Sequence, residues 1–188
     1  MNKPLLLFVG PSGSGKTTVA EYLESTLGYK SVQSYTTRPP RYENETGHIF
    51  VSNDEFDKLQ DLVAYTEYDG NKYCATSEQV DEADIYVIDI PGVEVFLKKY
   101  KNTKRPIYIM YFDADIHIRI DRMINRHDHD TAIVSRIYKD TEYNWIIKLS
   151  KIVNKHKGAT SAENVYFHII HAEKPLLDVV DEVLWYIQ

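Results

Sequence analysis

Apolar positions follow two patterns that alternate along the chain. Short apolar runs occupy residues 3–9, 85–90, 106–112 and 165–170, whereas apolar residues recur every three or four positions in residues 18–27, 93–100, 116–124, 131–157 and 175–187. A run without alternation is typical of a strand buried on both faces, and the longer recurrence is typical of an amphipathic helix. The alternation predicts an α/β fold with a mostly parallel central sheet and helices on both faces. The pattern in residues 131–157 fits one long helix or two.

Weaker signals fill the region between the first helix and the second apolar run. A helix is predicted after Asn53 or Asp54, because either side chain can cap a first turn. Its apolar face is expected to contain Phe56, Leu59, Leu62 and Val63. Residues 64–73 predict two strands joined by the tight turn Asp69-Gly70-Asn71.

Composition narrows the classes of protein that fit this pattern. The chain has 188 residues, of which 43% are hydrophobic and 27% charged, as expected of one soluble globular domain. Its net charge of −6 gives no electrostatic reason to expect nucleic acid or a membrane as a partner. The single cysteine, Cys74, excludes an internal disulfide, and the first apolar run is too short for a signal peptide. We therefore expect a cytoplasmic protein, and the sequence leaves its oligomeric state open.

A glycine-rich stretch joins the first apolar run to the first helix. It matches the pattern GxxxxGK[ST] and reads Gly10-Pro11-Ser12-Gly13-Ser14-Gly15-Lys16-Thr17. Backbone N–H groups of such a loop and the following helix N-terminus can bind phosphate, with Lys16 reaching the outer phosphates and Thr17 ligating Mg²⁺. The loop residues 10–17 and Thr18 are therefore expected to bind ATP. The alternative, a glycine-rich turn with a surface lysine, requires a chance match of four fixed positions.

A second anion site is predicted shortly after this helix. The segment Ser34-Tyr35-Thr36-Thr37-Arg38-Pro39-Pro40-Arg41 has four hydroxyl side chains, two arginines three positions apart, and two prolines that prevent a helix. Guanidinium groups bind phosphate with two parallel hydrogen bonds, so arginines in a stiff loop can converge on one phosphate. A polar surface loop is the alternative interpretation of this segment.

Together, these two motifs resemble those of the guanylate kinases. The segments Gly47-His48-Ile49-Phe50-Val51-Ser52 and Asp54-Glu55-Phe56 are also similar to that family, and the resemblance extends to about residue 136. It implies that Ser34, Arg38 and Arg41 hold the phosphate of the acceptor nucleotide. Tyr73 matches a further phosphate-binding tyrosine. His48 stands where the family usually has a tyrosine, and is either a hydrogen-bond donor to phosphate or an ordinary loop histidine.

The predicted hairpin departs from the family where the base is recognised. Ala64 stands where the family has a glutamate that reads guanine, and Cys74-Ala75 replaces glycine followed by serine or threonine. Guanine presents two donor groups, N1–H and the N2 amino group, so a carboxylate is its natural partner. Glu67 lies three residues along the strand, on the opposite face, and Thr76 could supply the missing hydroxyl. The identity of the base stays open.

Asp89 lies near the end of the apolar run of residues 85–90. It matches the second aspartate of a motif of the family, whereas Val87 replaces the first aspartate of that motif and Pro91 replaces its glutamine. The resemblance implies that Asp89 holds Mg²⁺ through water or contacts the acceptor nucleoside. The alternative is that Asp89 only caps the next turn.

Arginines follow in and after the helix of residues 116–124. In the family, arginines that flank a short lid close over the ATP phosphates, and Arg126 and Arg136 are the best matches. They are separated by a segment that includes His127-Asp128-His129-Asp130. For each arginine a solvated helix position is the alternative. A metal site in the His-Asp-His-Asp run is disfavoured, because further ligands are missing.

These inferences predict a P-loop fold in one domain, with a core (1–33, 81–125 and 159–188), a nucleoside-monophosphate-binding insert (34–80) and a lid with its following helix (126–158). The expected reaction moves the γ-phosphoryl group of ATP to a (deoxy)nucleoside 5′-monophosphate, with Mg²⁺ as cofactor and nucleotides as the only partners. The catalytic residues are expected to be Lys16, Arg38, Arg126 and Arg136.

The resemblance implies GMP or dGMP as the acceptor, and Ala64 and Ala75 favour the alternative of a non-guanine or modified base. A non-catalytic interaction module is the third hypothesis.

Overall fold

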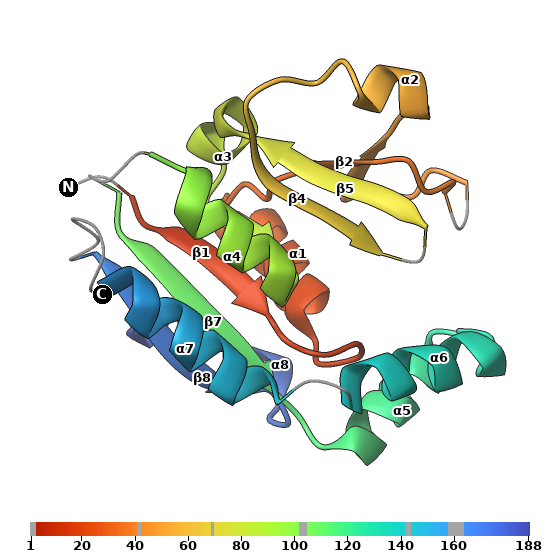
Figure 1. Ribbon diagram of the computed structural model, residues 1–188. Helices are drawn as coiled ribbons and strands as arrows, with labels where there is room; N and C mark the ends of the chain where they lie inside the picture. Colours follow the sequence, from red (N-terminus) through yellow and green to blue (C-terminus); the bar gives the residue numbers. More distant parts are fainter. Residues whose placement is uncertain (1–2, 41–42, 69, 102–104, 142–143, 158–163) are drawn as a thin grey trace.

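The computed structural model describes residues 3–40, 43–68, 70–101, 105–141, 144–157 and 164–188. Its first sheet has four parallel strands in the order β6-β1-β7-β8 (Figure 1). These strands are β1 (Leu5–Val9), β6 (Ile85–Val87), β7 (Ile107–Asp113) and β8 (Val165–His171). The α/β fold with a parallel sheet, as predicted from the alternation of apolar runs and helices, is confirmed.

Both faces of this sheet are covered by helices. Leu5, Leu7 and Val9 of β1 belong to one apolar cluster with α4 (Ile90–Lys99) and α7 (Trp145–Lys157), whereas Leu6 and Phe8 belong to another with α1 (Lys16–Leu27) and α8 (Leu176–Trp185). Successive side chains of a strand point to opposite faces, so an unbroken apolar run can serve both layers. All five residues of β1 are fully buried.

The second sheet has the order β3-β2-β5-β4, and lies across α4 from the first (Figure 1). Its strands are β2 (Ser34–Thr36), β3 (His48–Phe50), β4 (Leu62–Tyr68) and β5 (Asn71–Thr76), and β4 and β5 form the predicted hairpin. Val63, Ala64 and Ala75 belong to the apolar cluster that contains α4. This packing attaches the second sheet to the first and fixes where the hairpin faces.

Some predictions about local structure between residues 52 and 90 were wrong, and one helix was missed. Helix α2 (Asn53–Phe56) is a single turn whose N-cap is Ser52 and not Asn53 or Asp54, and the Ser52 side chain forms a capping box with Glu55. Leu59 lies beyond this helix, and Leu62 and Val63 lie in β4, because the pairing of Leu62 and Ala64 with β5 outweighs the helical spacing of these apolar residues. A further helix, α3 (Ser77–Glu82), was not predicted, and β6 ends at Val87 so that Ile90 already lies in α4.

The remaining helices lie beyond the carboxyl ends of β1 and β7. They are α5 (Ile116–Asn125) and α6 (Asp130–Thr141), and α6 ends beside the loop that follows β1 (Figure 1). The sequence pattern of residues 131–157 therefore corresponds to two helices, α6 and α7. Among the described residues, no helix combines the length and the apolar composition needed to cross a membrane.

Candidate functional site

The glycine-rich loop leaves the carboxyl end of β1 and leads directly into α1. Its backbone is tightly enclosed: a Cβ atom on Gly13 would lie 2.6 Å from the carbonyl oxygen of Arg119, and one on Gly10 would lie 2.7 Å from that of Phe112. Gly13 also has a φ of 77°, a left-handed conformation that side chains disfavour. These contacts explain why the loop requires glycine where α5 and β7 press against it.

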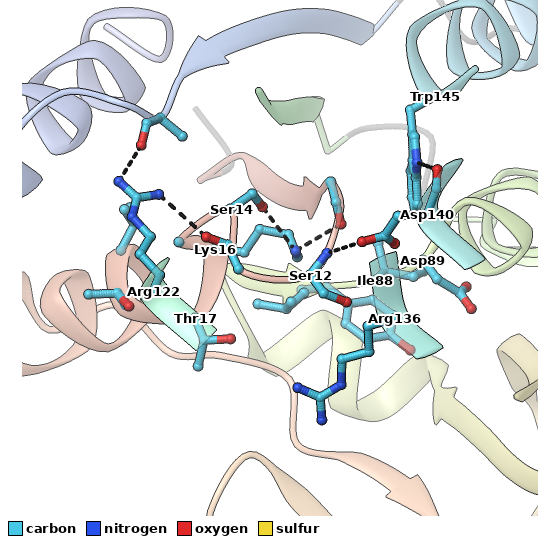
Figure 2. Close-up of a pocket in the computed structure, with 18 of the residues that line it drawn as sticks. Ser12, Ser14, Lys16, Thr17, Ile88, Asp89, Arg122, Arg136, Asp140 and Trp145 are labelled. Atoms are coloured by element: carbon cyan, nitrogen blue, oxygen red, sulfur yellow. Dashed lines mark hydrogen bonds between the residues drawn. The ribbon is translucent and has the colours of Figure 1, made fainter. Parts of the chain in front are cut away.

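Lys16 lies at the start of α1, and its side chain folds back over the loop. Its Nζ donates hydrogen bonds to the carbonyl oxygens of Gly10 and Pro11, both at 2.8 Å, and to Oγ of Ser14 at 3.1 Å (Figure 2). Burial lowers the pKa of Lys16 to about 8, against the opposing influence of the Asp140 carboxylate. The ammonium group of Lys16 is therefore held by two backbone carbonyl oxygens and one hydroxyl oxygen of its own loop.

A cavity of about 810 Å³ runs from this loop to the second sheet. It brings together most of the residues that the sequence indicated. Those that line it are Gly10, Ser12, Gly13, Ser14, Gly15, Lys16, Thr17 and Thr18 on one side, with Ser34, His48, Tyr73, Asp89, Arg126 and Arg136 around the rest. Pro11, Arg38, Glu67 and Thr76 are not among the described lining residues, and Arg41 lies outside the described residues.

Three side chains of the second sheet form a polar group opposite the loop. Oγ of Ser34 lies 2.9 Å from Nδ1 of His48, which is its partner residue across β2 and β3. The His48 ring stands edge-on to the Tyr73 ring of β5, with 5.9 Å between ring centroids. His48 is therefore part of the expected acceptor side of the cavity and not an isolated loop histidine.

Arg38 follows β2 and is held by a carboxylate. Its two terminal nitrogens donate to the two oxygens of Glu45, at 3.1 and 2.8 Å, and the two side chains are only 11% and 6% exposed. Nη1 also donates to the carbonyl oxygen of Pro39 at 2.8 Å. The guanidinium face that would bind a phosphate in a two-bond arrangement is thus occupied by Glu45, which the sequence pattern did not indicate.

The face of the hairpin that lines the cavity carries Ala64, Thr66 and Tyr68. Ala64 pairs with Ala75 across the two strands, so two small side chains lie side by side where the family has polar ones. Glu67 lies on the opposite face of β4 and accepts a hydrogen bond from the Tyr65 hydroxyl, as the alternation of a strand requires. Thr76 caps α3 in a capping box with Gln79. The structure therefore does not bring Glu67 or Thr76 into the cavity.

Asp89 caps the helix that follows it and also faces the cavity, while its contact with Mg²⁺ or with the acceptor nucleoside stays a prediction. Its side chain caps α4 by accepting a hydrogen bond from the Gly92 N–H at 2.7 Å, and it also lines the cavity. Burial raises the pKa of the Asp89 carboxyl, although hydrogen bonds from Gly92 and from the Thr66 side chain counteract it. The bond with Thr66 connects the Asp89 carboxylate to the cavity-lining face of the hairpin.

Arg126 and Arg136 meet at one carboxylate beyond the phosphate loop. Both donate to Oδ2 of Asp128, each at 2.5 Å in its shortest contact, and both line the cavity. Among the residues that the structure describes, no three His, Cys, Asp or Glu side chains gather as a metal site would require, so the His-Asp-His-Asp run shows none. The two arginines that the family resemblance indicated are thus placed next to each other.

Several residues of the site were not anticipated from the sequence. Asp140 of α6 accepts a hydrogen bond from the Ser12 N–H at 3.0 Å and one from Arg119 at 2.9 Å. Arg122 donates to the carbonyl oxygen of Ala172 at 2.7 Å and lies beside the loop (Figure 2). The only signal for Asp140 in the sequence is its position four residues after Arg136, which places both side chains on one side of a helix.

A phosphate loop between β1 and α1, in a parallel sheet with helices on both faces, defines the chain as a P-loop nucleotide-binding protein. The model of the family described as "AAA domain" matches residues 6–143. The guanylate kinase of Clostridium tetani (strain Massachusetts / E88) is 30% identical over an alignment of 199 residues, and the alignment covers 98% of this chain and 94% of that protein. The guanylate kinase of Streptococcus pyogenes serotype M3 (strain ATCC BAA-595 / MGAS315) is 31% identical over 154 residues, which cover 73% of this chain and 71% of that protein.

The fold points in the same direction. The crystal structure of guanylate kinase from Anaplasma phagocytophilum has a TM-score of 0.51 with this chain, covering 97% of it and 83% of the other chain, at 15% sequence identity. This likeness concerns the fold alone, whereas the sequence similarity to the C. tetani protein extends over nearly the whole chain. The chain therefore belongs to the guanylate kinase family, and it is an enzyme of the ATP-dependent nucleoside monophosphate kinase class.

Proposed function

We propose that this enzyme transfers the γ-phosphoryl group of ATP to the 5′-phosphate of a (deoxy)nucleoside monophosphate. The observation that carries the proposal is the single cavity that joins the phosphate loop to the group of Ser34, His48 and Tyr73. In-line transfer needs donor and acceptor phosphates in one enclosed space, with cations around the group that moves. Lys16, Arg126 and Arg136 all line this space.

The chemistry assigned to each residue follows from its charge and position. Lys16 and the loop N–H groups neutralise the donor phosphates, while Ser34, His48 and Tyr73 bind the acceptor phosphate. Arg38 joins the acceptor site when phosphate replaces Glu45 as its partner, and Arg41 is expected there from the family resemblance. Arg126 and Arg136 stabilise charge on the transferred group. The attacking phosphate oxygen is already ionised at neutral pH, so the reaction needs no general base.

Magnesium is the cofactor that this donor site would use. Thr17 directly follows the loop lysine and lines the cavity, and a single hydroxyl is a fitting protein ligand for Mg²⁺, which usually keeps several waters and takes its other ligands from substrate phosphates. When bound, the ion would neutralise charge on the β- and γ-phosphates. In this proposal Thr17 holds the ion and Lys16 stays available to the outer phosphates.

Guanine is the first candidate for the acceptor base, because of the family to which the chain belongs. In this arrangement Asp89 is the carboxylate that accepts from the guanine donors, held toward them by Thr66 and Gly92. A second candidate is a non-guanine or modified base, and the adjacent Ala64 and Ala75 favour it. These small side chains leave room beside the base and remove the hydrogen-bonding groups that the family uses there.

A panel of ribo- and deoxyribonucleoside monophosphates with ATP and Mg²⁺ tests the proposal, with ADP formation as the measurement. Turnover of at least one monophosphate is expected, with GMP or dGMP fastest under the first candidate and another base fastest under the second. Absence of turnover for every monophosphate, with a folded protein that binds ATP, would overturn the proposed function.

Ala64→Glu sharpens the question of the base. We expect kcat/KM for GMP to rise about tenfold, because a carboxylate at this cavity-lining position adds charged hydrogen bonds to guanine. Ala64→Gln is the matched control, since it has the same size without the charge. A GMP rate that is unchanged or reduced in Ala64→Glu, with an unaltered melting temperature, would contradict the assignment of position 64 to the base site.

A further inference from the structure

An ion pair that the sequence did not predict holds the phosphate loop against α5 and α6. Oδ2 of Asp140 accepts from Nη1 of Arg119 at 2.9 Å, and the two side chains are 11% and 9% exposed. The same Oδ2 accepts from the Ser12 N–H at 3.0 Å, and Nη1 of Arg119 donates to the Ser12 carbonyl oxygen at 3.3 Å. Ser12 in the loop is thus held at both its N–H and its C=O.

Two further contacts make this a junction of several segments. The Arg119 backbone of α5 lies directly against Gly13, where a Cβ atom would clash with it. The carbonyl oxygen of Asp140 accepts from Nε1 of Trp145 at 3.0 Å, which connects the last turn of α6 to the first turn of α7 (Figure 2). The position of α6 relative to the loop is therefore set at Asp140.

This junction lies one helical turn from Arg136. Four residues of an α-helix span about 6 Å along its axis, and positions i and i+4 lie on the same side. Both Arg136 and Asp140 line the cavity, next to Ser12 and Lys16 (Figure 2). Because a helix turn is stiff, an anchor at Asp140 limits where the Arg136 guanidinium can reach.

We propose that Asp140 and Arg119 are positioning residues for phosphoryl transfer, which anchor the last turn of α6 to Ser12 and thereby hold Arg136 over the donor phosphates. This inference rests on the proposed function. The two residues act through Arg136, which they hold in place by tying α6 to the loop backbone, and neither is assigned a contact with the group that moves. The anchor fixes the carboxyl-terminal end of α6. The amino-terminal end of α6, together with Asp128 and Arg126 in the residues before it, stays able to adjust to the nucleotide.

A different role for Asp140 would be that of an anion that fills the loop until ATP displaces it. The contacts of Lys16 argue against this, because its ammonium group, which binds outer phosphates, donates to Gly10, Pro11 and Ser14. The charged hydrogen bond of Asp140 goes to Arg119 instead. The two roles differ in their effect on ATP binding: removal of an anchor lowers kcat, whereas removal of a competing anion tightens ATP binding.

The test compares Asp140→Ala and Asp140→Asn with the wild-type enzyme in steady-state kinetics and in ATP binding by calorimetry. We expect kcat to fall roughly 10- to 100-fold in Asp140→Ala, the range typical of a misplaced catalytic group, with a smaller loss in Asp140→Asn, which keeps an acceptor for Ser12. The ATP dissociation constant is expected to stay within about threefold. Asp121→Asn, an exposed carboxylate of α5, is the matched control and should behave as wild type.

A double variant separates positioning from a general loss of structure. If Asp140 acts through Arg136, Asp140→Ala combined with Arg136→Ala will be no slower than Arg136→Ala alone. Arg119→Lys is expected to retain more activity than Arg119→Met, because it keeps the charge that faces Asp140.

Three outcomes would overturn the inference: an unchanged kcat in Asp140→Ala, losses that multiply in the double variant, or tighter ATP binding. Each requires an active wild-type enzyme. A wild type that phosphorylates no monophosphate would instead count against the proposed function.

Discussion

The two ends of the cavity, which both face phosphate in the proposed reaction, are built in different ways. The donor end is one continuous loop, residues 10–17, whose backbone conformation is fixed by glycines packed against α5 and β7. The acceptor end is assembled from side chains of three strands, with Ser34, His48 and Tyr73 brought together by the register of β2, β3 and β5. A backbone site depends on local sequence, whereas a side-chain site depends on how distant segments pair.

The cations at the two ends differ in the same way. Lys16 is held by backbone and hydroxyl oxygens of its own loop. Within the part of the chain that the structure describes, no carboxylate forms a hydrogen bond with its ammonium group. Arg38 is held by the carboxylate of Glu45. In the proposed reaction the donor end therefore offers a positive charge directly, whereas Arg38, which does not line the cavity, must exchange Glu45 for phosphate before it joins the acceptor end. Substitutions at the two ends should accordingly affect different kinetic constants.

Substitution of the donor cation should have the largest effect. In Lys16→Ala we expect kcat to fall roughly 10²–10³-fold, because the charge that develops on the donor phosphates loses its fixed partner. The measurement is steady-state turnover with saturating acceptor. Lys98→Ala, at an exposed lysine of α4 paired with Glu94, is the control. A loss in Lys16→Ala smaller than about fivefold would contradict the assigned role.

Substitution of the acceptor cation should have an intermediate effect on a different constant. Arg38→Ala is expected to raise KM for the monophosphate roughly 10- to 100-fold and to leave KM for ATP nearly unchanged, because it removes charged hydrogen bonds to the acceptor alone. Glu45→Gln should lower the KM for the monophosphate a few-fold, because phosphate then has to displace a neutral amide from Arg38 in place of a carboxylate. The control is Glu43→Gln, since Glu43 is exposed. Equal changes in both KM values would remove the distinction between the two ends.

The smallest expected effect is a pH dependence that belongs to the donor end. With a pKa of about 8, Lys16 loses its proton as pH rises through that value, and the neutral amine binds phosphate poorly. We expect kcat/KM for ATP to fall roughly fourfold between about pH 7 and about pH 8.5. In Lys16→Arg this decrease should disappear, because the guanidinium stays charged. A flat wild-type profile would show that Lys16 titrates at higher pH in the free enzyme.

The same contrast explains how much of the molecule the sequence predicted. The buried strands and the phosphate loop could be recognised because their signals are contiguous: an apolar run, glycines, Lys16 and a helix start. Pairs such as Arg38 with Glu45, and Arg119 with Asp140 at 21 residues of separation, form only after helices and strands pack. Val63 was misplaced for a related reason, since the pairing of its neighbours Leu62 and Ala64 with β5 and its own burial in the cluster that contains α4 decided its conformation more than helical spacing did. Roles in catalysis for the arginines stay predictions.

The way β4 and β5 pack on α4 has a consequence for how the protein unfolds. Val63, Ala64 and Ala75 share one apolar cluster with Leu7 of the central strand and Phe96 of α4, and Thr66 is bonded to the residue that caps α4. Opening the hairpin would expose part of the core of the parallel sheet and uncap a helix. The β4–β5 hairpin and the central sheet are therefore expected to unfold as one cooperative unit, in which the backbone amides of the hairpin gain the protection of the core.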